Sequence, residues 1–332
     1  MRTAQILRKS RWITVFALLL AALLLYIAFR GVDWTELWRI IQSARLEYLA
    51  LACLLASANC LLRSLRWLVL LSAERWLGVL DVFWAMMVGY LGNLFLPVRA
   101  GEVVRSVALG HRVQINAGFV LATALTERIL DAGVLVLIGS AALTTLHTAS
   151  PTLLNAGKGM AILSAGGLVG VFILPVLERP FQWVLAHLPL PFAWKTLLSG
   201  LLEQFSLGMR SLRHTGRALS FLALTAVIWL GDAVVAITVA YSVGMAISIP
   251  QAFLLIVALG LSSAIPSTPG YIGVYQFVAV TVLHPFGFTN SQALAYIICF
   301  QALGYIVLTW WGLLGLWKLE AFRKQAEITT NK

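Results

Sequence analysis

Long apolar segments separated by short polar ones run along almost the whole chain. A helix needs about 20 mostly apolar residues to cross the hydrocarbon core of a bilayer. Six segments come close to that length or exceed it, at residues 12–29, 46–71, 116–146, 159–177, 218–243 and 290–317. The pattern therefore predicts an all-α polytopic membrane protein with six full spans.

Two further apolar segments, at about 82–112 and 251–284, are interrupted by proline and glycine before they can cross. In the first, only about 15 residues precede Pro97, which is too few for a span. The second breaks at Pro266, and neither of its pieces spans alone. In lipid, a broken helix is tolerated only where protein or a water-filled cavity satisfies its backbone groups. We therefore predict two re-entrant broken-helix hairpins that meet something polar.

The two breaks resemble each other in their spacing. Glycine precedes proline by five residues in the first (Gly92, Pro97) and by six in the second (Gly260, Pro266), and another glycine follows each proline four residues later. The first hairpin is expected to enter from the cytoplasm and the second from outside, which is the arrangement of an inverted repeat. Coincidence among glycines and prolines in an apolar chain is the alternative.

Basic residues divide the chain into two membrane halves. Residues 1–177 form the N-terminal half and 218–332 the C-terminal half, and the basic segment 178–217 connects them. Because basic loops stay in the cytoplasm, this connector and both termini are predicted to be cytoplasmic, which requires that the first hairpin does not cross fully. The amphipathic segment 32–41, which contains tryptophans, is expected along the outer membrane face.

Composition agrees with a membrane protein. The chain is 60% hydrophobic and 11% charged, with a mean hydropathy of +0.89, whereas soluble domains carry about 25% charged residues. The net charge of +11 is explained by cytoplasmic loops and anionic lipid headgroups, so no nucleic-acid partner is expected. The three cysteines lie in apolar segments and the five histidines have no metal-ligand spacing, so neither a disulfide, a metal nor a cofactor is predicted.

Three charged residues, Glu127, Arg128 and Asp131, fall near the middle of the third full span. Inserting one charged side chain at that depth costs about 2.5–3.5 kcal/mol of free energy. A structural or functional role is therefore needed to explain three of them. One interpretation is structural: Arg128 pairs with Asp131, and Glu127 faces Arg99, Arg105 or Arg63 on neighbouring elements. The other is a polar pathway in which arginines hold a phosphate while the carboxylates orient them or carry protons. The two interpretations are compatible.

Arg99 and Arg105 are the preferred phosphate ligands, because a guanidinium offers two parallel hydrogen bonds. Their alternative role is to anchor the first hairpin at the cytoplasmic face. Asn59, Arg63 and Arg66 form one polar stripe on the second span, and Arg66 is expected to snorkel to the cytoplasmic end.

Further candidates come from the C-terminal half. Asp232, in the middle of its span, either titrates or bonds a neighbouring helix, and residues of the second hairpin are expected to line a cavity. The predicted substrate-binding residues are Asn93, Arg99, Glu102, Arg105, Glu127, Arg128, Asp131, Arg63, Asp232, Tyr271, Tyr275 and Gln276.

The segments that carry a family likeness are 93–102 with Arg105, Glu127 and Arg128 with Asp131, and 266–276. Here the chain resembles the transmembrane region of lysylphosphatidylglycerol synthase and the standalone flippase-like membrane proteins grouped with it. The resemblance implies a protein that moves a lipid or lipid-linked molecule between leaflets. Synthase members add a soluble aminoacyl-transferase domain that is not expected here, so their substrate does not carry over.

The function we predict is a flippase for an anionic phospholipid or lipid-linked envelope precursor, in the bacterial inner membrane. No Walker A sequence is present, so transport is expected to be downhill or driven by a proton on Glu127, Asp131 or Asp232. The expected partners are membrane lipids with an anionic headgroup and either a second copy or a partner synthase. A membrane-embedded enzyme using Glu127 or Asp131 as general base, or an accessory subunit, is the alternative.

Overall fold

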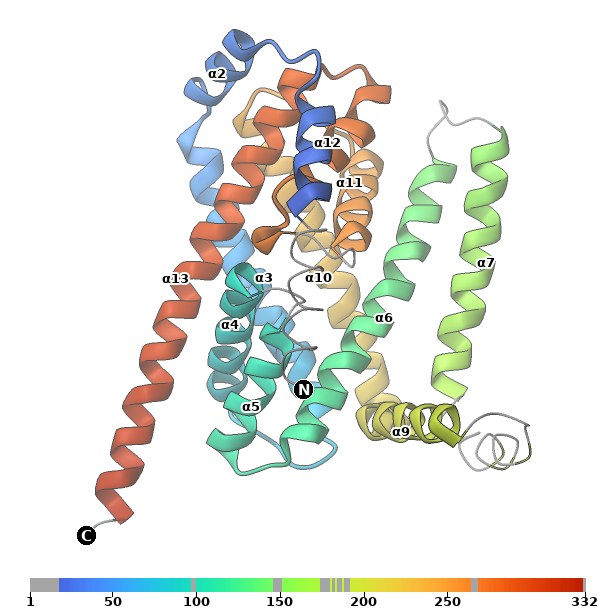
Figure 1. Cartoon of the computed structure of the whole chain (residues 1–332), viewed down its shortest axis with the longest axis vertical. Coiled ribbons are helices and arrows are strands. Elements are labelled where there is room, and N and C mark those ends of the chain that lie inside the picture. The colour runs from blue at the N-terminus through green and yellow to red at the C-terminus, as the bar shows by residue number, and fades with distance from the viewer. Residues whose placement is uncertain are drawn as a thin grey trace, which may run out of the picture.

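The computed structural model describes residues 18–96, 100–145, 151–173, 192–263 and 268–330, together with the single positions 180, 183 and 187. These residues form helices joined by short turns, and no strand occurs among them (Figure 1). The all-α prediction is therefore confirmed. The tips of both predicted hairpins, including Pro97, Arg99 and Pro266, lie outside the described residues.

Among the residues that the structure describes, three helices are long and apolar enough to cross a membrane. They are α3 (Leu46–Leu71), α10 (Thr215–Ser242) and the part of α13 (Asn290–Thr330) that ends at Glu320. The helix 18–29 and α2 (Trp34–Gln42) together have the length of a fourth, but they are bent by 92°. The predicted number of six full spans stays a prediction.

The bend before α2 is fixed by capping. Asp33 Oδ1 accepts hydrogen bonds from the backbone N–H groups of Thr35 and Glu36, at 2.8 and 3.1 Å, and so begins the new helix. The same residue's N–H donates to Ser291 Oγ, at 3.0 Å, at the start of α13. The amphipathic α2 therefore lies across one end of the helical bundle (Figure 1).

The first hairpin consists of α4 (Val79–Phe95) and α5 (Gly101–Val113). The two helices cross at Gly89 and Gly101, where a Cβ on Gly89 would lie 2.9 Å from the Gly101 carbonyl oxygen. Asn93 Oδ1 accepts a hydrogen bond from the N–H of Gly101, at 2.9 Å, which ties the start of α5 to α4. Glycine is required at this crossing because any side chain would separate the helices.

The second hairpin consists of α11 (Ile249–Ser262) and α12 (Val274–Leu283), with the short helix η3 (Pro269–Tyr271) between them. Gly270 and Gly273 have φ values of 73° and 91°, which residues with a side chain rarely adopt. These two glycines turn the chain back toward the end from which α11 came.

The two hairpins start at opposite ends of the bundle. The N–H of Arg45, just before α3, donates to the carbonyl of Ser242, the last residue of α10, at 2.8 Å. Since α11 follows α10 and α4 follows the far end of α3, the hairpins begin at opposite ends and point toward each other (Figure 1). Their placement in a membrane stays a prediction.

Among the described residues, five more helices complete the fold. They are α6 (Ala117–Thr144), α7 (Pro151–Ile173), α9 (Phe192–Met209), η2 (Arg210–Arg213) and η4 (His284–Phe286). Helix α9 lies across the lower end in Figure 1, and η4 precedes α13. Much of the predicted connector, 178–217, lies outside the described residues, and the division into halves stays a prediction.

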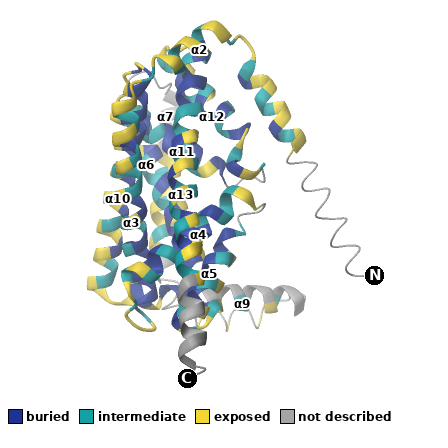
Figure 2. Ribbon diagram, turned by 90° about the vertical axis from the view of Figure 1, so that its left-hand side faces the viewer, coloured by how far each residue is buried: buried dark blue, intermediate teal, exposed yellow. Residues whose placement is uncertain are grey.

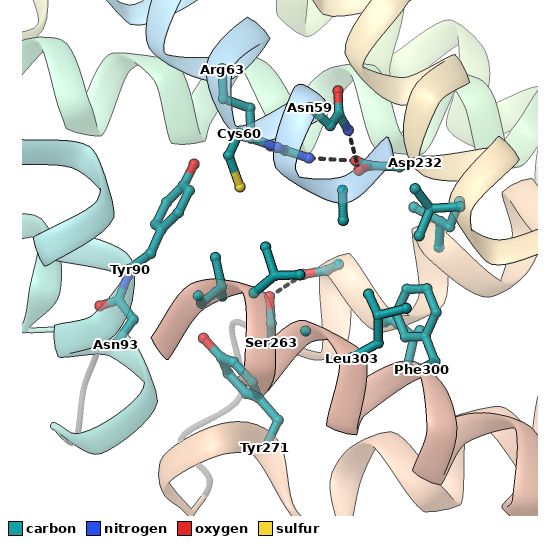
Figure 3. Close-up of a pocket in the computed structure, with 18 of the residues that line it drawn as sticks. Asn59, Cys60, Arg63, Tyr90, Asn93, Asp232, Ser263, Tyr271, Phe300 and Leu303 are labelled. Carbon is teal, nitrogen blue, oxygen red and sulfur yellow. Dashed lines mark hydrogen bonds and ion pairs between the residues drawn. The ribbon is translucent and has the colours of Figure 1, made fainter. Parts of the chain in front are cut away.

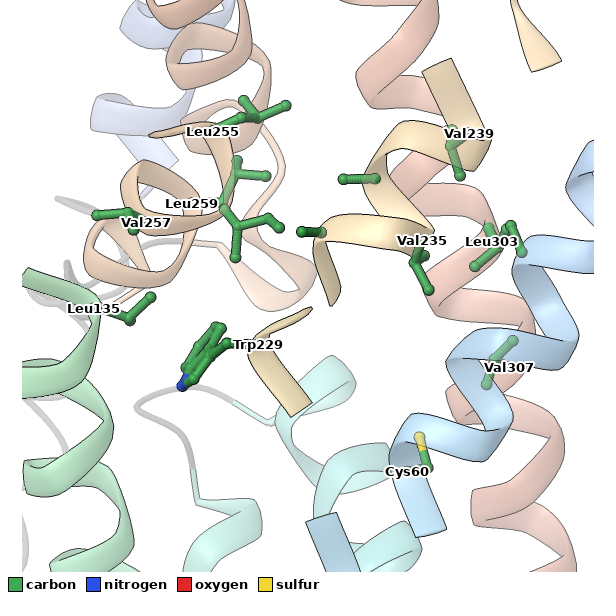
Figure 4. Close-up of a cluster of buried hydrophobic side chains, with 14 of the residues drawn as sticks. Cys60, Leu135, Trp229, Val235, Val239, Leu255, Val257, Leu259, Leu303 and Val307 are labelled. Carbon is green, nitrogen blue, oxygen red and sulfur yellow. The ribbon is translucent and has the colours of Figure 1, made fainter. Parts of the chain in front are cut away.

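Buried residues concentrate at the centre, while large apolar side chains remain exposed on the outer faces of the helices (Figure 2). An exposed apolar exterior is what lipid contact requires. One buried apolar cluster joins α10, α11 and α13 through Val235, Val239, Leu255, Leu259 and Leu303 (Figure 4). This cluster fixes α11 against the two long helices and so positions one wall of the central cavity.

Candidate functional site

A cavity of about 360 Å³ lies where the ends of α4 and α11 meet α3, α10 and α13 (Figure 3). Its polar and aromatic lining residues are Asn59, Arg63, Tyr90, Asn93, Arg128, Trp229, Asp232, Ser263, Tyr271, Tyr275 and Phe300. Ligand sites in proteins have volumes of about 300–1,000 Å³ and combine apolar walls with a few polar groups. The cavity therefore has the size and composition of a ligand site.

One wall of the cavity holds an ion pair between two helices (Figure 3). Arg63 of α3 pairs through Nη2 with Oδ2 of Asp232 on α10. Asn59 Nδ2 donates to the other carboxylate oxygen of Asp232, at 2.5 Å, and to the carbonyl of Ile228, at 3.1 Å. The Arg63 guanidinium also lies over the ring of Trp229, 5.4 Å from its centroid. Both charged side chains keep some exposure, 17% for Arg63 and 25% for Asp232.

The other walls differ in character (Figure 3). Tyr90 and Asn93 reach the cavity from α4, and the stacked rings of Tyr271 and Tyr275, with centroids 4.9 Å apart, reach it from the second hairpin. Leucine, valine and isoleucine side chains of α10, α11 and α13 line the remainder. The cavity is thus polar on one side and apolar on the other, which suits an amphiphilic ligand.

Next to the cavity, buried ion pairs join α3 to α6. Arg66 bonds both carboxylate oxygens of Asp131, Nη1 to Oδ1 at 2.6 Å and Nη2 to Oδ2 at 2.9 Å. Its Nη2 also donates to Glu127 Oε1 at 2.7 Å, and its Nη1 to Thr225 Oγ1 at 3.3 Å. Arg66 itself is fully buried. Two helices are therefore tied together by one arginine that is satisfied by two acids.

The same set of ion pairs continues into the first hairpin. Glu127 Oε2 accepts a hydrogen bond from Arg105 Nη2 at 3.0 Å, and Arg105 Nε lies 2.6 Å from Glu102 Oε2. Glu102 Oε1 accepts from Nε and Nη2 of Arg128, at 3.0 and 2.7 Å. Arg105 also stacks on Trp67, with its guanidinium carbon 4.3 Å from the ring centroid.

Together these six side chains, the buried network, alternate in charge: Asp131, Arg66, Glu127, Arg105, Glu102 and Arg128. Three acids and three arginines sum to zero, which is how a low-dielectric interior tolerates charge. Five of the six are buried, and only the Arg128 side chain, 31% exposed, reaches the cavity. The buried network therefore holds helices together, and Arg128 is the place where it meets the cavity.

The predicted site residues fall into four groups. Arg63, Asn93, Arg128, Asp232, Tyr271 and Tyr275 line the cavity. Glu102, Arg105, Glu127 and Asp131 belong to the buried network. Gln276 instead caps α12, because its Oε1 accepts from the N–H of Gly273 at 2.7 Å. Arg99 lies outside the described residues.

Two sequence-based interpretations are wrong. Arg66 does not snorkel to the cytoplasmic end, because α6 packs against it and supplies two carboxylates. Arg128 does not pair with Asp131, because Arg66 occupies both oxygens of that acid while Arg128 reaches Glu102 in the first hairpin. Glu127 does face Arg105, as one alternative predicted, and Asp232 does bond a neighbouring helix.

Sequence reasoning left three contributors out of the site: Arg66, Asn59 and Tyr90. Arg66 and Asn59 belong to the polar stripe on the second span, so the position of that stripe could have identified both as site residues. Tyr90 carried no signal that distinguishes it from an interfacial tyrosine. Over the part of the chain that the structure describes, no group of three or more His, Cys, Asp or Glu side chains could hold a metal ion.

Comparison with known proteins gives two matches. The family described as "Lysylphosphatidylglycerol synthase TM region" matches residues 14–312. The protein named glycosyltransferase AglD from Haloferax volcanii is 25% identical over 311 residues, which cover 83% of this chain and 49% of that relative. The chain thus spans about half the length of this relative. No solved structure matches the chain.

Proposed function

The chain belongs to the family of the lysylphosphatidylglycerol synthase transmembrane region, and from this premise we propose that it moves an anionic phospholipid or a lipid-linked envelope precursor between the two leaflets. The lipid headgroup occupies the central cavity, and the acyl chains stay in the bilayer. This proposal extends what is established, that the protein is a multi-pass membrane protein of this family.

The observation that carries the proposal is the presence of two arginines on one amphiphilic cavity. Arg63 and Arg128 come from different helices, and each is oriented by an acid, Asp232 and Glu102 respectively. Arginine suits a lipid phosphate because its planar fork makes two parallel charge-assisted hydrogen bonds. A volume of about 360 Å³ holds a headgroup rather than a whole lipid, so the chains have to remain outside.

The arrangement of the two hairpins supports a route through the protein. They start at opposite ends of the bundle, and residues of both, such as Tyr90 and Tyr271, line the same cavity. We propose six full spans with two re-entrant hairpins related as an inverted repeat, with both termini cytoplasmic in the bacterial inner membrane. Rocking of one hairpin against the other would expose the cavity to each side in turn.

A vesicle assay tests the proposal. Purified protein is reconstituted into liposomes that contain fluorescently labelled phosphatidylglycerol, and dithionite quenching reports the rate at which label reaches the outer leaflet. Arg63→Gln and Arg128→Gln should each lower the protein-dependent rate roughly tenfold or more, because a charge-assisted hydrogen bond contributes about 1.5–3 kcal/mol.

The matched control is Arg39→Gln, which removes an exposed arginine from α2, at one end of the bundle and outside the cavity lining. This variant should keep the wild-type rate, and size-exclusion chromatography verifies that all three variants stay folded. Equal rates for wild type, Arg63→Gln and Arg128→Gln would remove the cavity from the transport route. No acceleration by wild type with any anionic lipid would remove the transport proposal itself.

A second candidate is a membrane-embedded enzyme, or an accessory subunit of one, acting on a lipid-linked substrate. It is favoured by the name of the relative, glycosyltransferase AglD. A general base in such an enzyme has to reach the substrate. Glu127 and Asp131 are buried and engaged by arginines, whereas Asp232 faces the cavity. The enzyme hypothesis therefore moves the base to Asp232, and product formed by purified protein from lipid-linked sugar donors would support it over transport.

A further inference from the structure

The charges around the cavity balance to zero. Among the described residues, the buried network contributes three acids and three arginines, and the cavity wall adds one pair, Arg63 with Asp232. A phosphodiester headgroup brings one further negative charge into this interior. An uncompensated charge in a low-dielectric site is costly, so binding favours the entry of a proton or a cation with the anion.

Three of the four carboxylates are poorly placed to accept that proton. The side chains of Glu127, Asp131 and Glu102 are 3%, 8% and 9% exposed, and both oxygens of each lie within ion-pair or hydrogen-bond distance of an arginine. Asp232 differs, because its side chain is 25% exposed and lines the cavity. A proton that arrives through the cavity therefore meets Asp232 first.

The surroundings of Asp232 define what competes for that proton. The titratable and charged groups that line the same cavity are Cys60 and Arg63 from α3, Tyr90 from α4, Arg128 from α6, and Tyr271 and Tyr275 from the second hairpin. Asp131 of the buried network lies behind them and is held by Arg66. The lining residues of α11 and α13 include no charged side chain. Asp232 is thus the only carboxylate among the cavity-lining residues that the structure describes.

The geometry of the pair explains how a proton and an anion can be exchanged for each other. Arg63 pairs with Oδ2 of Asp232, while Oδ1 accepts from Asn59. A proton on Oδ2 occupies the position that Arg63 uses and leaves the bond from Asn59 intact. The released guanidinium, still packed over Trp229, can then direct two parallel N–H groups at the phosphate oxygens.

We propose that an anionic phosphodiester binds Arg63 in the central cavity together with one proton, which is taken up by Asp232. This inference rests on the proposed function, and it assigns phosphate binding to Arg63 and proton uptake to Asp232. The bound state is then electrically neutral overall, and binding is tighter on the more acidic side. Since protons bind with the anion, raising the pH above neutral should weaken binding by roughly tenfold per unit, as linkage requires for one proton.

The experiment is isothermal titration calorimetry of the purified, detergent-solubilised protein with dioctanoyl phosphatidylglycerol. Titrations at one pH in buffers of different ionisation enthalpy give the number of protons taken up per lipid bound. Wild type should take up about one proton, and Asp232→Asn should take up about none while binding the lipid with little dependence on pH. Arg63→Gln should bind at least tenfold more weakly.

Asp81→Asn is the matched control. Asp81 pairs with Arg112 near the start of the first hairpin, and the two side chains are 29% and 16% exposed, much like Asp232 and Arg63. Because Asp81 does not line the central cavity, this variant should still take up about one proton per lipid. A changed proton count would mean that a partly exposed carboxylate outside the cavity also contributes to proton uptake, and it would overturn the assignment to Asp232.

The wild-type measurement decides the matter even if a variant fails to fold. Lipid binding without proton uptake in wild type overturns the coupling and leaves the transport proposal standing. Proton uptake that persists in Asp232→Asn overturns the role of Asp232. No binding of the anionic lipid at any pH overturns the coupling together with the proposed substrate class.

Discussion

The first hairpin, α4–α5, is tied to its neighbours by charged side chains, whereas the second, α11–α12, is tied by amides and a tyrosine hydroxyl. In the first, Arg105 connects Glu102 on its own helix to Glu127 on α6. In the second, Gln301 of α13 donates to the carbonyl of Gly270 at 2.6 Å and accepts from Gln276 at 2.8 Å. Both sets of bonds are buried, and both fix a broken helix beside the same cavity.

Of the two hairpins, only the first is joined by an ion pair among the described residues to a charged residue of the cavity. Arg128 links the cavity directly to Glu102 in the first hairpin, so a ligand that binds Arg128 competes with a bond that holds this hairpin. The second hairpin presents Tyr271 and Tyr275 and no charged residue among the cavity-lining groups. A change in the charge state of the ligand should therefore be felt mainly by the first hairpin.

Arg105→Met tests the contribution of charge to the first hairpin and has the largest expected effect. The change keeps a long side chain but leaves Glu102 and Glu127 without one of their buried partners. Removing one partner of a buried ion pair costs about 3–5 kcal/mol. The free energy of unfolding, measured by titration with a denaturing detergent in micelles, should fall by about that amount.

The control for this measurement is Arg39→Met, because Arg39 is exposed on α2. Its free energy of unfolding should stay within about 0.5 kcal/mol of wild type. A loss below about 1 kcal/mol for Arg105→Met would mean that water reaches Glu102 and Glu127, and the contrast between the hairpins would disappear.

Gln301→Met applies the same test to the second hairpin. The change leaves the carbonyl of Gly270 with its bond from Tyr305, at 2.5 Å, and removes the oxygen that accepts from Gln276 Nε2. Neutral hydrogen bonds that are lost on burial cost about 1–3 kcal/mol, so the free energy of unfolding should fall less than for Arg105→Met. Gln42→Met, at an exposed position of α2, is the control. A cost for Gln301→Met equal to or above that of Arg105→Met would contradict the comparison.

The positions of the two breaks could be predicted because they depend on residues close together in the chain. A proline removes a backbone donor, and a glycine permits turns, wherever they occur. Gly270 and Gly273 do turn the chain between α11 and α12, as the sequence indicated. The charged residues of α6 could be singled out for the same reason, because a charge within an apolar segment is unusual whatever its partners are.

The partners of those charges could not be predicted from spacing alone. Arg128 and Asp131 lie three residues apart on one helix, which made their pairing the simplest expectation. The pairs that form instead join α6 to α3 and to α5, and they depend on which helices pack together. The position of Arg66 near the end of its span suggested snorkelling, and only the packing of α6 against it explains why it is buried. The sequence therefore predicts which charged residues belong to the site more readily than it predicts their bonding partners.

Asp81→Asn sharpens the comparison by asking whether every ion pair of the first hairpin matters or only the buried ones. Asp81 lies in the first turn of α4 and pairs with Arg112 near the end of α5, and both side chains are partly exposed. Ion pairs that water can reach contribute about 0–1 kcal/mol and weaken further with salt. The free energy of unfolding should therefore fall by less than about 1 kcal/mol, and the difference from wild type should shrink as salt is added. A loss of several kcal/mol that salt does not reduce would show that this end of the hairpin is as dry as the buried network, and that the first hairpin is held by charge along its whole length.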